Sequence, residues 1–194
     1  MKSMRDWYCG LGGASQPFFD HGWNVERYDN YAPLRDHVAG LTFTAVQDVQ
    51  QYDLPLVDLE WFSPPCTEFS HGRVPQIEKP DMTEFLWCLQ RTNYLSRKGV
   101  FWCLENVRGA IKHFKPYLGP PRLIIDTHIC LWGNFPLFEM PRGWERPLKT
   151  DEDVWSDNPL RANLKALVPY EIGNRLRLAI LGHRKLDEFG IIIS

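Results

Sequence analysis

The most constraining feature of this sequence is a set of short runs that are apolar at nearly every position. Residues 99–106 read GVFWCLEN, and residues 56–62 read LVDLEWF. GVFWCLEN is apolar without alternation up to Leu104, which predicts a strand buried on both faces, and LVDLEWF, although it contains Asp58 and Glu60, is also predicted to be a buried strand. Residues 82–97 lie between these two runs and carry apolar side chains at helical spacing. Strands that alternate with helices predict an α/β fold with a mostly parallel sheet.

The remaining segments extend this pattern along the chain. A run DWYC at residues 6–9 precedes a glycine-rich turn. Further strands are expected at residues 23–29, 43–48 and 128–135, and further helices at residues 14–22, 32–40 and 172–183. Residues 139–167 are rich in Pro, Trp and charged residues and have no clear period, which predicts a loop-rich insertion or a small subdomain.

Length and composition favour a single globular domain. The 194 residues are 44% hydrophobic and 24% charged, and no apolar stretch approaches the ~20 residues of a membrane span. No signal peptide is recognisable at the start, so we expect a cytoplasmic protein. The five cysteines are scattered, without a CxxC pair or a Cys/His cluster, and predict neither disulfides nor a metal site. The net charge of −2 means that any basic surface must be local.

Polar residues follow the first three predicted strands. Gly10, Gly12 and Gly13 form the turn after the first strand, where glycines let a backbone approach a ligand. Asp29 ends the second strand and suits the hydroxyls of a ribose, with Glu26 as a rival. After the third strand, an acid could accept a hydrogen bond from an adenine amine, and this candidate is Asp48. Each of these features also has a purely structural interpretation, as a tight turn, a surface acid or a helix cap. The three strand ends together favour an adenosine-containing cofactor.

The next two strand ends carry a thiol and a carboxyl group. Cys66 lies in SPPCTEFS, a loop of polar residues stiffened by two prolines, whereas Cys88, Cys103 and Cys130 lie in apolar runs typical of core cysteines. A thiol held in this way suits a nucleophile. Glu105 ends a buried strand, where a carboxylate is costly without a partner or a role. The alternative is a Glu that caps the following turn.

Three motifs in this order, DWYCGLGG, PPCTEFS and LENVRG, resemble the core motifs of the cytosine-C5 DNA methyltransferases. The C-terminal VPYEIGNRLRLAI is similar to the family's last motif. The resemblance covers about residues 5–138 and 168–181. It implies a Rossmann-like, class I methyltransferase fold, with residues 1–138 and 168–194 as the catalytic domain and 139–167 as a short insertion in place of the target-recognition domain.

The resemblance also implies S-adenosylmethionine as the cofactor. The positions that would bind it are Tyr8, Gly10, Leu11, Gly12, Gly13, Asp29, Asp48, Pro65 and Asn174. The catalytic positions would be Cys66, Glu105, Pro65, Asn106 and His128. Cys66 would add to C6 of cytosine, and Glu105 would bond N3 of the ring.

Two departures from the family pattern stand out. The stretch RLIIDTHICLWG replaces the usual Gln-x-Arg-x-Arg motif, so that Asp126 and His128 occupy the arginine positions. His128 is a candidate to bond O2 of cytosine, with a core histidine as the alternative, and Arg122 could instead reach in from upstream. The second departure is the insertion at 139–167, which has five Lys/Arg against six Asp/Glu and is not basic enough to bind a duplex alone.

Positively charged residues gather instead around the Glu-Asn-Val motif, residues 105–107 of LENVRG. We expect these cations to flank the opening of the active site. The residues concerned are Arg97, Lys98, Arg108, Lys112, Lys115 and Arg122, with Arg73 after the cysteine loop. Arg73, Arg108 and Arg122 are the candidates for contact with nucleic acid. The alternative is an ordinary solvated helix surface.

The sequence therefore predicts methyl transfer to C5 of cytosine in duplex or single-stranded DNA. The same chemistry on RNA or on a cytosine nucleotide, and a homodimeric or partner-dependent subunit, are alternatives. The compact size suggests a phage or bacterial DNA-modification enzyme. A nicotinamide enzyme is disfavoured because GLGG lacks the full glycine spacing.

Overall fold

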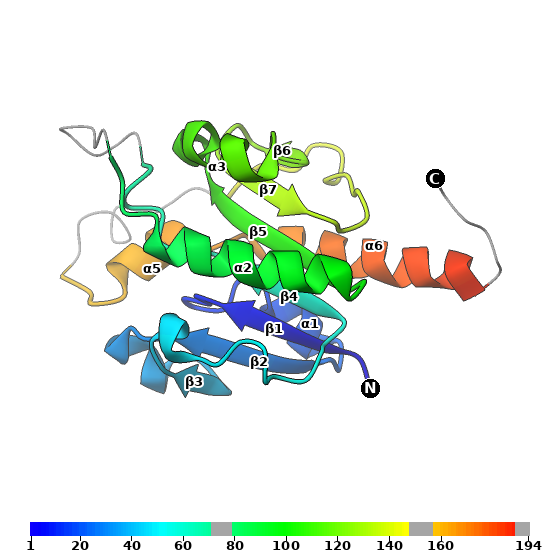
Figure 1. Cartoon of the computed structure of the whole chain (residues 1–194), viewed down its shortest axis with the longest axis horizontal. Coiled ribbons are helices and arrows are strands. Elements are labelled where there is room, and N and C mark those ends of the chain that lie inside the picture. Colours follow the sequence, from blue (N-terminus) through cyan, green and yellow to red (C-terminus); the bar gives the residue numbers. More distant parts are fainter. Residues whose placement is uncertain (71–78, 148–156, 189–194) are drawn as a thin grey trace.

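The chain forms one seven-stranded sheet (Figure 1), in a computed structural model that describes residues 1–70, 79–147 and 157–188. The strands are β1 Ser3–Trp7, β2 Asn24–Asp29, β3 Leu41–Phe43, β4 Leu59–Phe62, β5 Phe101–Val107, β6 Leu123–Ile125 and β7 Ile129–Gly133. Their order is β3-β2-β1-β4-β5-β7-β6, and β7 alone runs against the other six. This is the Rossmann-like arrangement of class I methyltransferases, so the predicted fold class is confirmed.

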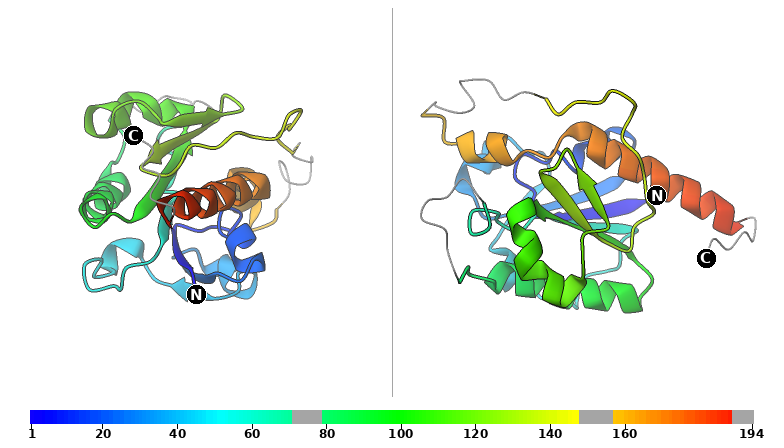
Figure 2. Two further views of the ribbon diagram at one scale, coloured as in Figure 1. Left: turned by 90° about the vertical axis from the view of Figure 1, so that its right-hand side faces the viewer. Right: turned by 90° about the horizontal axis from the view of Figure 1, so that it is seen from above.

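Helices cover both faces of the sheet (Figure 2). They are α1 Gln16–Asp20, α2 Thr83–Arg97, α3 Ile111–Leu118, α5 Arg161–Ala166 and α6 Tyr170–Glu188, with short 3₁₀ helices η1 Ala32–Asp36, η2 Val46–Asp48 and η3 Arg108–Ala110. One core cluster joins the sheet to α1 and α6, and a second joins it to α2 and α3. Within the described residues, no helix combines the length and apolar character that a membrane crossing requires.

The layered structure explains why β5 reads as a continuous apolar run. Successive side chains of a strand point to opposite faces, and here Trp102 and Leu104 join the core beneath α2 and α3 while Cys103 joins the core beneath α1 and α6. The same alternation directs Glu105 to the face that carries α6. Asn106 therefore points to the face that carries α2.

A buried ion cluster ties β1, β4 and α2 together. Glu60 is fully buried on β4 and accepts hydrogen bonds from Arg5 Nη1 (2.9 Å), Trp7 Nε1 (2.8 Å) and Arg91 Nε (3.0 Å). Arg5 also binds Glu26 on β2 at 2.6 Å. Two guanidinium groups with no exposure thus share one buried carboxylate. The apolar appearance of LVDLEWF gave no sign of this cluster.

Several predicted elements differ from those observed. The strand expected at 43–48 is wrong, because β3 ends at Phe43 and Val46–Asp48 forms the 3₁₀ helix η2. The helix expected at 32–40 is only the short η1. The elements η3, α3, β6 and α5 were not predicted from the sequence. The helix expected at 172–183 is part of the longer α6, and the domain boundaries around 139–167 stay a prediction.

Candidate active site

The parallel register brings four strand ends to one edge of the sheet. Trp7 on β1 pairs with Tyr28 on β2 and with Phe62 on β4, and Phe62 pairs with Leu104 on β5. The residues that follow these positions therefore meet at the carboxyl edge, where ligands bind in open α/β sheets. The glycine turn, Asp29, the cysteine loop and Glu105 all lie at this edge.

The turn after β1 uses left-handed backbone conformations. Gly10 and Gly12 have φ of 51° and 76°, and Tyr8 adopts 58°, which is unusual for a residue with a side chain. A Cβ on Gly13 would lie 2.2 Å from the carbonyl oxygen of Val168, whereas a Cβ on Gly10 would meet nothing closer than 3.4 Å. The absence of a side chain at Gly13 therefore lets Val168 pack closely on the turn. At Gly10, even an added Cβ would keep an ordinary van der Waals distance from its nearest neighbour. Leu11 packs against the small core cluster around Cys9.

Asp6 lies buried just before this turn. Its two carboxyl oxygens have no hydrogen-bond partner within normal distance among the described residues, although Ser15 and Arg27 lie nearby. Burial raises the pKa of Asp6 to about 7, and Ser15 and the Arg27 cation offset only part of this effect. The sequence analysis did not select Asp6, since an acid at a strand end looks like an ordinary surface residue.

Asp29, and not Glu26, lies at the ligand edge. Asp29 Oδ2 accepts the backbone N–H of Gly10 at 2.9 Å, and Oδ1 accepts that of Tyr31 at 3.0 Å. Each oxygen keeps a second lone pair for a further donor. Glu26 lies three residues earlier on β2 and is paired with Arg5. Of the two acids, Asp29 is the one available to a ribose.

Tyr8 and the η2 region converge on the first turn of α2. The Tyr8 hydroxyl donates to Glu84, and the Gln47 amide donates to the other oxygen of the same carboxylate. The ring of Tyr8 meets that of Trp87 edge-on at 6.5 Å. Asp48 is exposed in η2, five residues beyond the end of β3. The sequence analysis missed Glu84, which at a helix start is easily taken for a capping residue.

The C-terminal motif VPYEIGNRLRLAI packs back onto the glycine turn. A Cβ on Gly173 would lie 2.2 Å from the carbonyl oxygen of Ala14, so only glycine lets α6 approach the start of α1 so closely. Asn174 Oδ1 accepts a hydrogen bond from Arg177 Nη2 at 2.8 Å. The α5 segment also reaches the turn, because Asn163 is the nearest neighbour of a Cβ built on Gly10. No local sequence pattern predicted this contact.

The cysteine loop is held from two sides. Asn106 is fully buried, and its Nδ2 donates to the carbonyl oxygen of Pro64 at 3.0 Å, which ties β5 to the loop. On the other side, the ring of Phe69 packs against Phe114 of α3 at 5.0 Å. Cys66 is partly exposed, and the other four cysteines are buried, as expected for Cys88, Cys103 and Cys130. Asn106 therefore ties β5 to the loop, and Pro65 is exposed beside Cys66.

Glu105 has the electrostatic character of a weak acid near neutrality. Burial raises its pKa from the usual 4.5 to about 7, while a hydrogen bond with the Ser63 hydroxyl and the charge of Arg146 act in the opposite direction. The group can therefore hold a proton at neutral pH, as a hydrogen-bond donor to a ring nitrogen must. Arg146 belongs to the insertion and was not selected from the sequence.

The candidates His128 and Arg108 both lie at the carboxyl end of β5. His128 is exposed, so its interpretation as a core histidine is wrong. It closes the tight β6–β7 turn, in which Asp126 and Thr127 both have positive φ. This turn and exposed Arg108 lie at the carboxyl end of β5, since Val107 pairs with Ile129.

The other basic candidates do not all reach this edge. Arg122 precedes the outermost strand β6, with its guanidinium 5.8 Å from the ring of Phe135. Arg97 and Lys98 lie at the amino edge, just before Phe101 of β5, so they do not flank the site. Arg73 lies outside the described residues.

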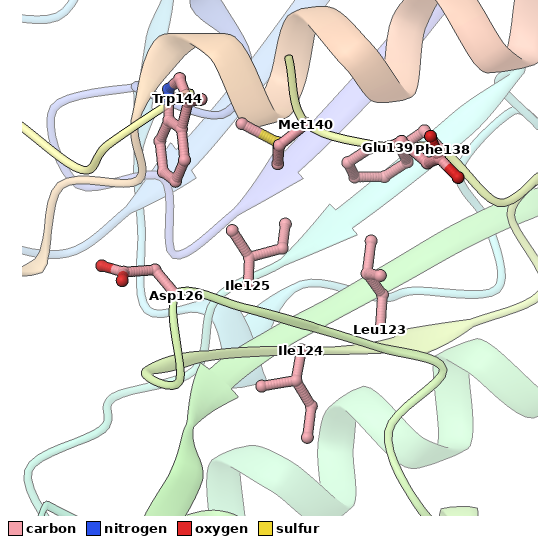
Figure 3. Close-up of a pocket in the computed structure, with 8 residues that line it drawn as sticks. All are labelled: Leu123, Ile124, Ile125, Asp126, Phe138, Glu139, Met140 and Trp144. Carbon is pink, nitrogen blue, oxygen red and sulfur yellow. The ribbon is translucent and has the colours of Figure 1, made fainter. Parts of the chain in front are cut away.

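A hollow of about 380 Å³ lies beside β6, the strand at the edge of the sheet (Figure 3). Leu123 and Ile125 of β6 form one wall, and Phe138, Met140 and Trp144 form the other, while Ile124 points away. A second hollow of about 720 Å³ continues along β6 toward α6. Neither contains Cys66 or Glu105, so they are separate from the candidate active site.

The carboxyl edge suits an adenosine-containing cofactor. Asp29 keeps lone pairs there, and Gly10 places no side chain above the turn. In contrast, no group of three or more His, Cys, Asp or Glu side chains able to hold a metal ion occurs among the residues that the structure describes.

Comparison with known proteins gives likenesses of structure only. No protein-family model matches the chain, and no curated protein sequence does. Among solved structures, the chain is similar to the Dnmt2 methyltransferase of S. pombe, with 18% identity and a TM-score of 0.41 over 61% of this chain and 39% of that one.

Two further structures are similar in the same way. One is a prophage-encoded E. coli protein assigned as a DNA modification methyltransferase, with 18% identity, a TM-score of 0.41 and coverage of 60% of this chain and 35% of that one. The other is a DNMT2 variant of Spodoptera frugiperda, with 20% identity, a TM-score of 0.36 and coverage of 56% and 36%. The chain thus spans well under half of these proteins, and the fold class follows from the strand order and register of its own sheet.

Proposed function

We propose that this protein transfers a methyl group from S-adenosylmethionine to C5 of cytosine in DNA. The observation that carries the proposal is the hydrogen bond from Asn106 to Pro64 at the carboxyl edge. It couples the strand that bears Glu105 to the loop that bears Cys66. A nucleophile and an acid with a pKa of about 7 are thereby presented from adjacent strand ends.

The proposed cofactor site lies on the neighbouring strand ends. Asp29 would hold the ribose, and the backbone from Gly10 to Gly13 would pass the methionine part, with Tyr8, Asp48 and Asn174 nearby. When bound, the cofactor supplies an electrophilic methyl group on a sulfonium. The chain's part is to hold this group beside the base that Cys66 engages.

Cys66 and Glu105 have complementary tasks in this mechanism. C5 of cytosine is a poor nucleophile because the ring is electron-poor. Addition of the Cys66 thiolate to C6 breaks the aromaticity and makes C5 enamine-like, while protonated Glu105 donates a hydrogen bond to N3. After methylation, a water molecule takes the C5 proton, the C6–S bond breaks to release the Cys66 thiolate, and the aromaticity of the ring is restored. In a duplex, the base must first leave the stack.

Arg146 is the residue that we propose in place of the missing arginine motif. It is partly buried and near enough to Glu105 for its charge to act on that carboxyl group. A guanidinium at this place can donate to O2 of cytosine while Glu105 engages N3. This assignment adds to the earlier candidates His128 and Arg122.

A methyl-transfer assay tests the proposal. Methyl-labelled S-adenosylmethionine is offered with duplex DNA, single-stranded DNA, transfer RNA or free cytosine nucleotides, with the Cys66→Ala variant as the control. We expect label on DNA that is lost in the variant. Label on RNA or nucleotides alone would replace DNA as the substrate, and no label on any of them, with cofactor still bound, would favour a subunit that needs a partner.

The Glu105→Gln variant should lower the transfer rate by at least ~10²-fold, the usual scale for a lost acid. In the wild-type protein the pKa of about 7 means that Glu105 is protonated at lower pH and loses its donor proton as pH rises. The wild-type rate should therefore fall above about pH 7, and Gln, which does not titrate, should remove that descending limb. Pre-steady-state rates between pH 6 and 9 provide the measurement. An unchanged rate and pH profile would mean that Glu105 is structural.

A further inference from the structure

The segment between Glu105 and Asp126 has a charge unlike the rest of the chain. It contains no Asp or Glu at all, although the whole chain has a net charge of −2. Its Lys and Arg residues are Arg108, Lys112, Lys115 and Arg122. Positive charge without interspersed acid is the electrostatic signature of a surface that meets phosphate groups.

Three of these cations form a continuous stripe. Arg108, Lys112 and Lys115 are all exposed, and they follow one another at intervals of four and three residues through η3 and α3, the spacing of one helix side. At 1.5 Å per residue the stripe is about 10 Å long. Among the described residues, none of the three forms an ion pair with an acid. We call these three residues the α3 stripe.

The α3 stripe begins at the candidate active site. Arg108 directly follows Val107, the last residue of β5, and α3 continues from there (Figure 1). The ring of His113, next to Lys112, lies 5.6 Å from the ring of Phe69 in the cysteine loop. Helix α3, which carries Lys112 and Lys115, therefore packs against the Cys66 loop.

The described residues of the insertion, 139–147 and 157–167, carry no comparable excess of positive charge. Its described cations are Arg142, Arg146, Arg161 and Lys165, and its described acids are Glu139, Glu145 and Asp157. Duplex binding relies on several phosphate contacts from basic residues, whereas the stripe offers three cations on one side only. A duplex would also need its target base opened, at a cost of a few kcal/mol. A single strand needs neither a second basic surface nor the opening of a base pair.

We propose that the α3 stripe binds the phosphates of a single-stranded polynucleotide and leads its target base to the Cys66 loop. This rests on the proposed function for the identity of the base. The attraction itself depends only on phosphate charge, so the backbone should be held without regard to sequence.

Fluorescence anisotropy with a labelled single-stranded DNA 20-mer tests this, using the Cys66→Ala protein so that no transfer occurs. Three phosphate contacts predict that log K falls with log[salt] with a slope of about −2, at about 0.7 per contact. The Lys112→Gln/Lys115→Gln variant should bind at least tenfold more weakly at 50 mM NaCl, with a slope reduced to about −0.7. The same sequence as a duplex should bind more weakly than the single strand.

The matched control is Arg97→Gln/Lys98→Gln, which removes the same charge at the opposite edge of the sheet. It should leave affinity and slope unchanged. Equal losses in the two double variants, or tighter binding of the duplex, would overturn the proposal. Because binding is measured without turnover, a stripe-dependent affinity stands even if no methyl transfer is found. Transfer to DNA that is insensitive to the stripe would instead retain the proposed function and remove this inference.

Discussion

Replacing Cys66 by alanine should abolish methyl transfer, by more than about 10⁴-fold, while leaving cofactor affinity within a few-fold. The thiolate is the only group in the proposed mechanism that breaks the aromaticity of cytosine. The proposed cofactor site lies on the ends of β1 and β2, so cofactor affinity should survive. Transfer of labelled methyl and calorimetry of cofactor binding provide the two measurements.

The matched control for Cys66→Ala is Thr67→Ala, an exposed neighbour in the same loop that should retain activity. A DNA substrate containing 5-fluorocytosine adds a direct readout. Its C5 position has no proton to lose, so the covalent complex should accumulate in the wild-type protein and be visible by mass spectrometry. Turnover that persists without the thiol, or a missing adduct in the wild-type protein, would contradict the covalent mechanism.

Replacing Glu60 by glutamine should lower the free energy of unfolding by about 3–5 kcal/mol, the range for breaking a buried ion pair. The change leaves the fully buried guanidinium groups of Arg5 and Arg91 without their shared counter-charge. The three side chains join β1, β4 and α2, so the loss should act on the whole domain. Urea denaturation followed by circular dichroism provides the measurement.

The same substitution at an exposed ion pair is the control for this prediction. Glu171 and Arg175 form an i,i+4 pair at 2.9 Å on α6, and both side chains are about one-third exposed. Exposed pairs of this kind contribute about 0.3–0.5 kcal/mol, so Glu171→Gln should have little effect. Similar losses in the two variants would mean that the buried cluster adds nothing beyond a surface pair.

The α/β class and most strands were predictable because the apolar runs are long enough to need burial on both faces. The helix at 82–97 was predictable for the same kind of reason, since its apolar positions follow the helical period. Short elements were not predictable. The three residues of β6 are too few to form a pattern, and the eight residues of α3 contain Pro116, a residue that argues against a helix interior.

The glycine turn, the cysteine loop and the Glu-Asn-Val motif could be found from the sequence because each is a local pattern with characteristic residue types. The sequence also placed them at strand ends, from which a shared edge follows in a parallel sheet. In this sense the sequence determined the fold class and the position of the candidate site.

The tertiary structure decided the relations between segments that are far apart in the chain. It paired Glu26 with Arg5 and left Asp29 at the ligand edge. It joined Asn106 to Pro64 across 42 residues, and it brought Arg146 near Glu105. Local residue patterns report which face of an element is apolar, but not which distant element covers that face. Partner choice, burial and the resulting pKa shifts therefore depended on the packed sheet and could not be read from the sequence.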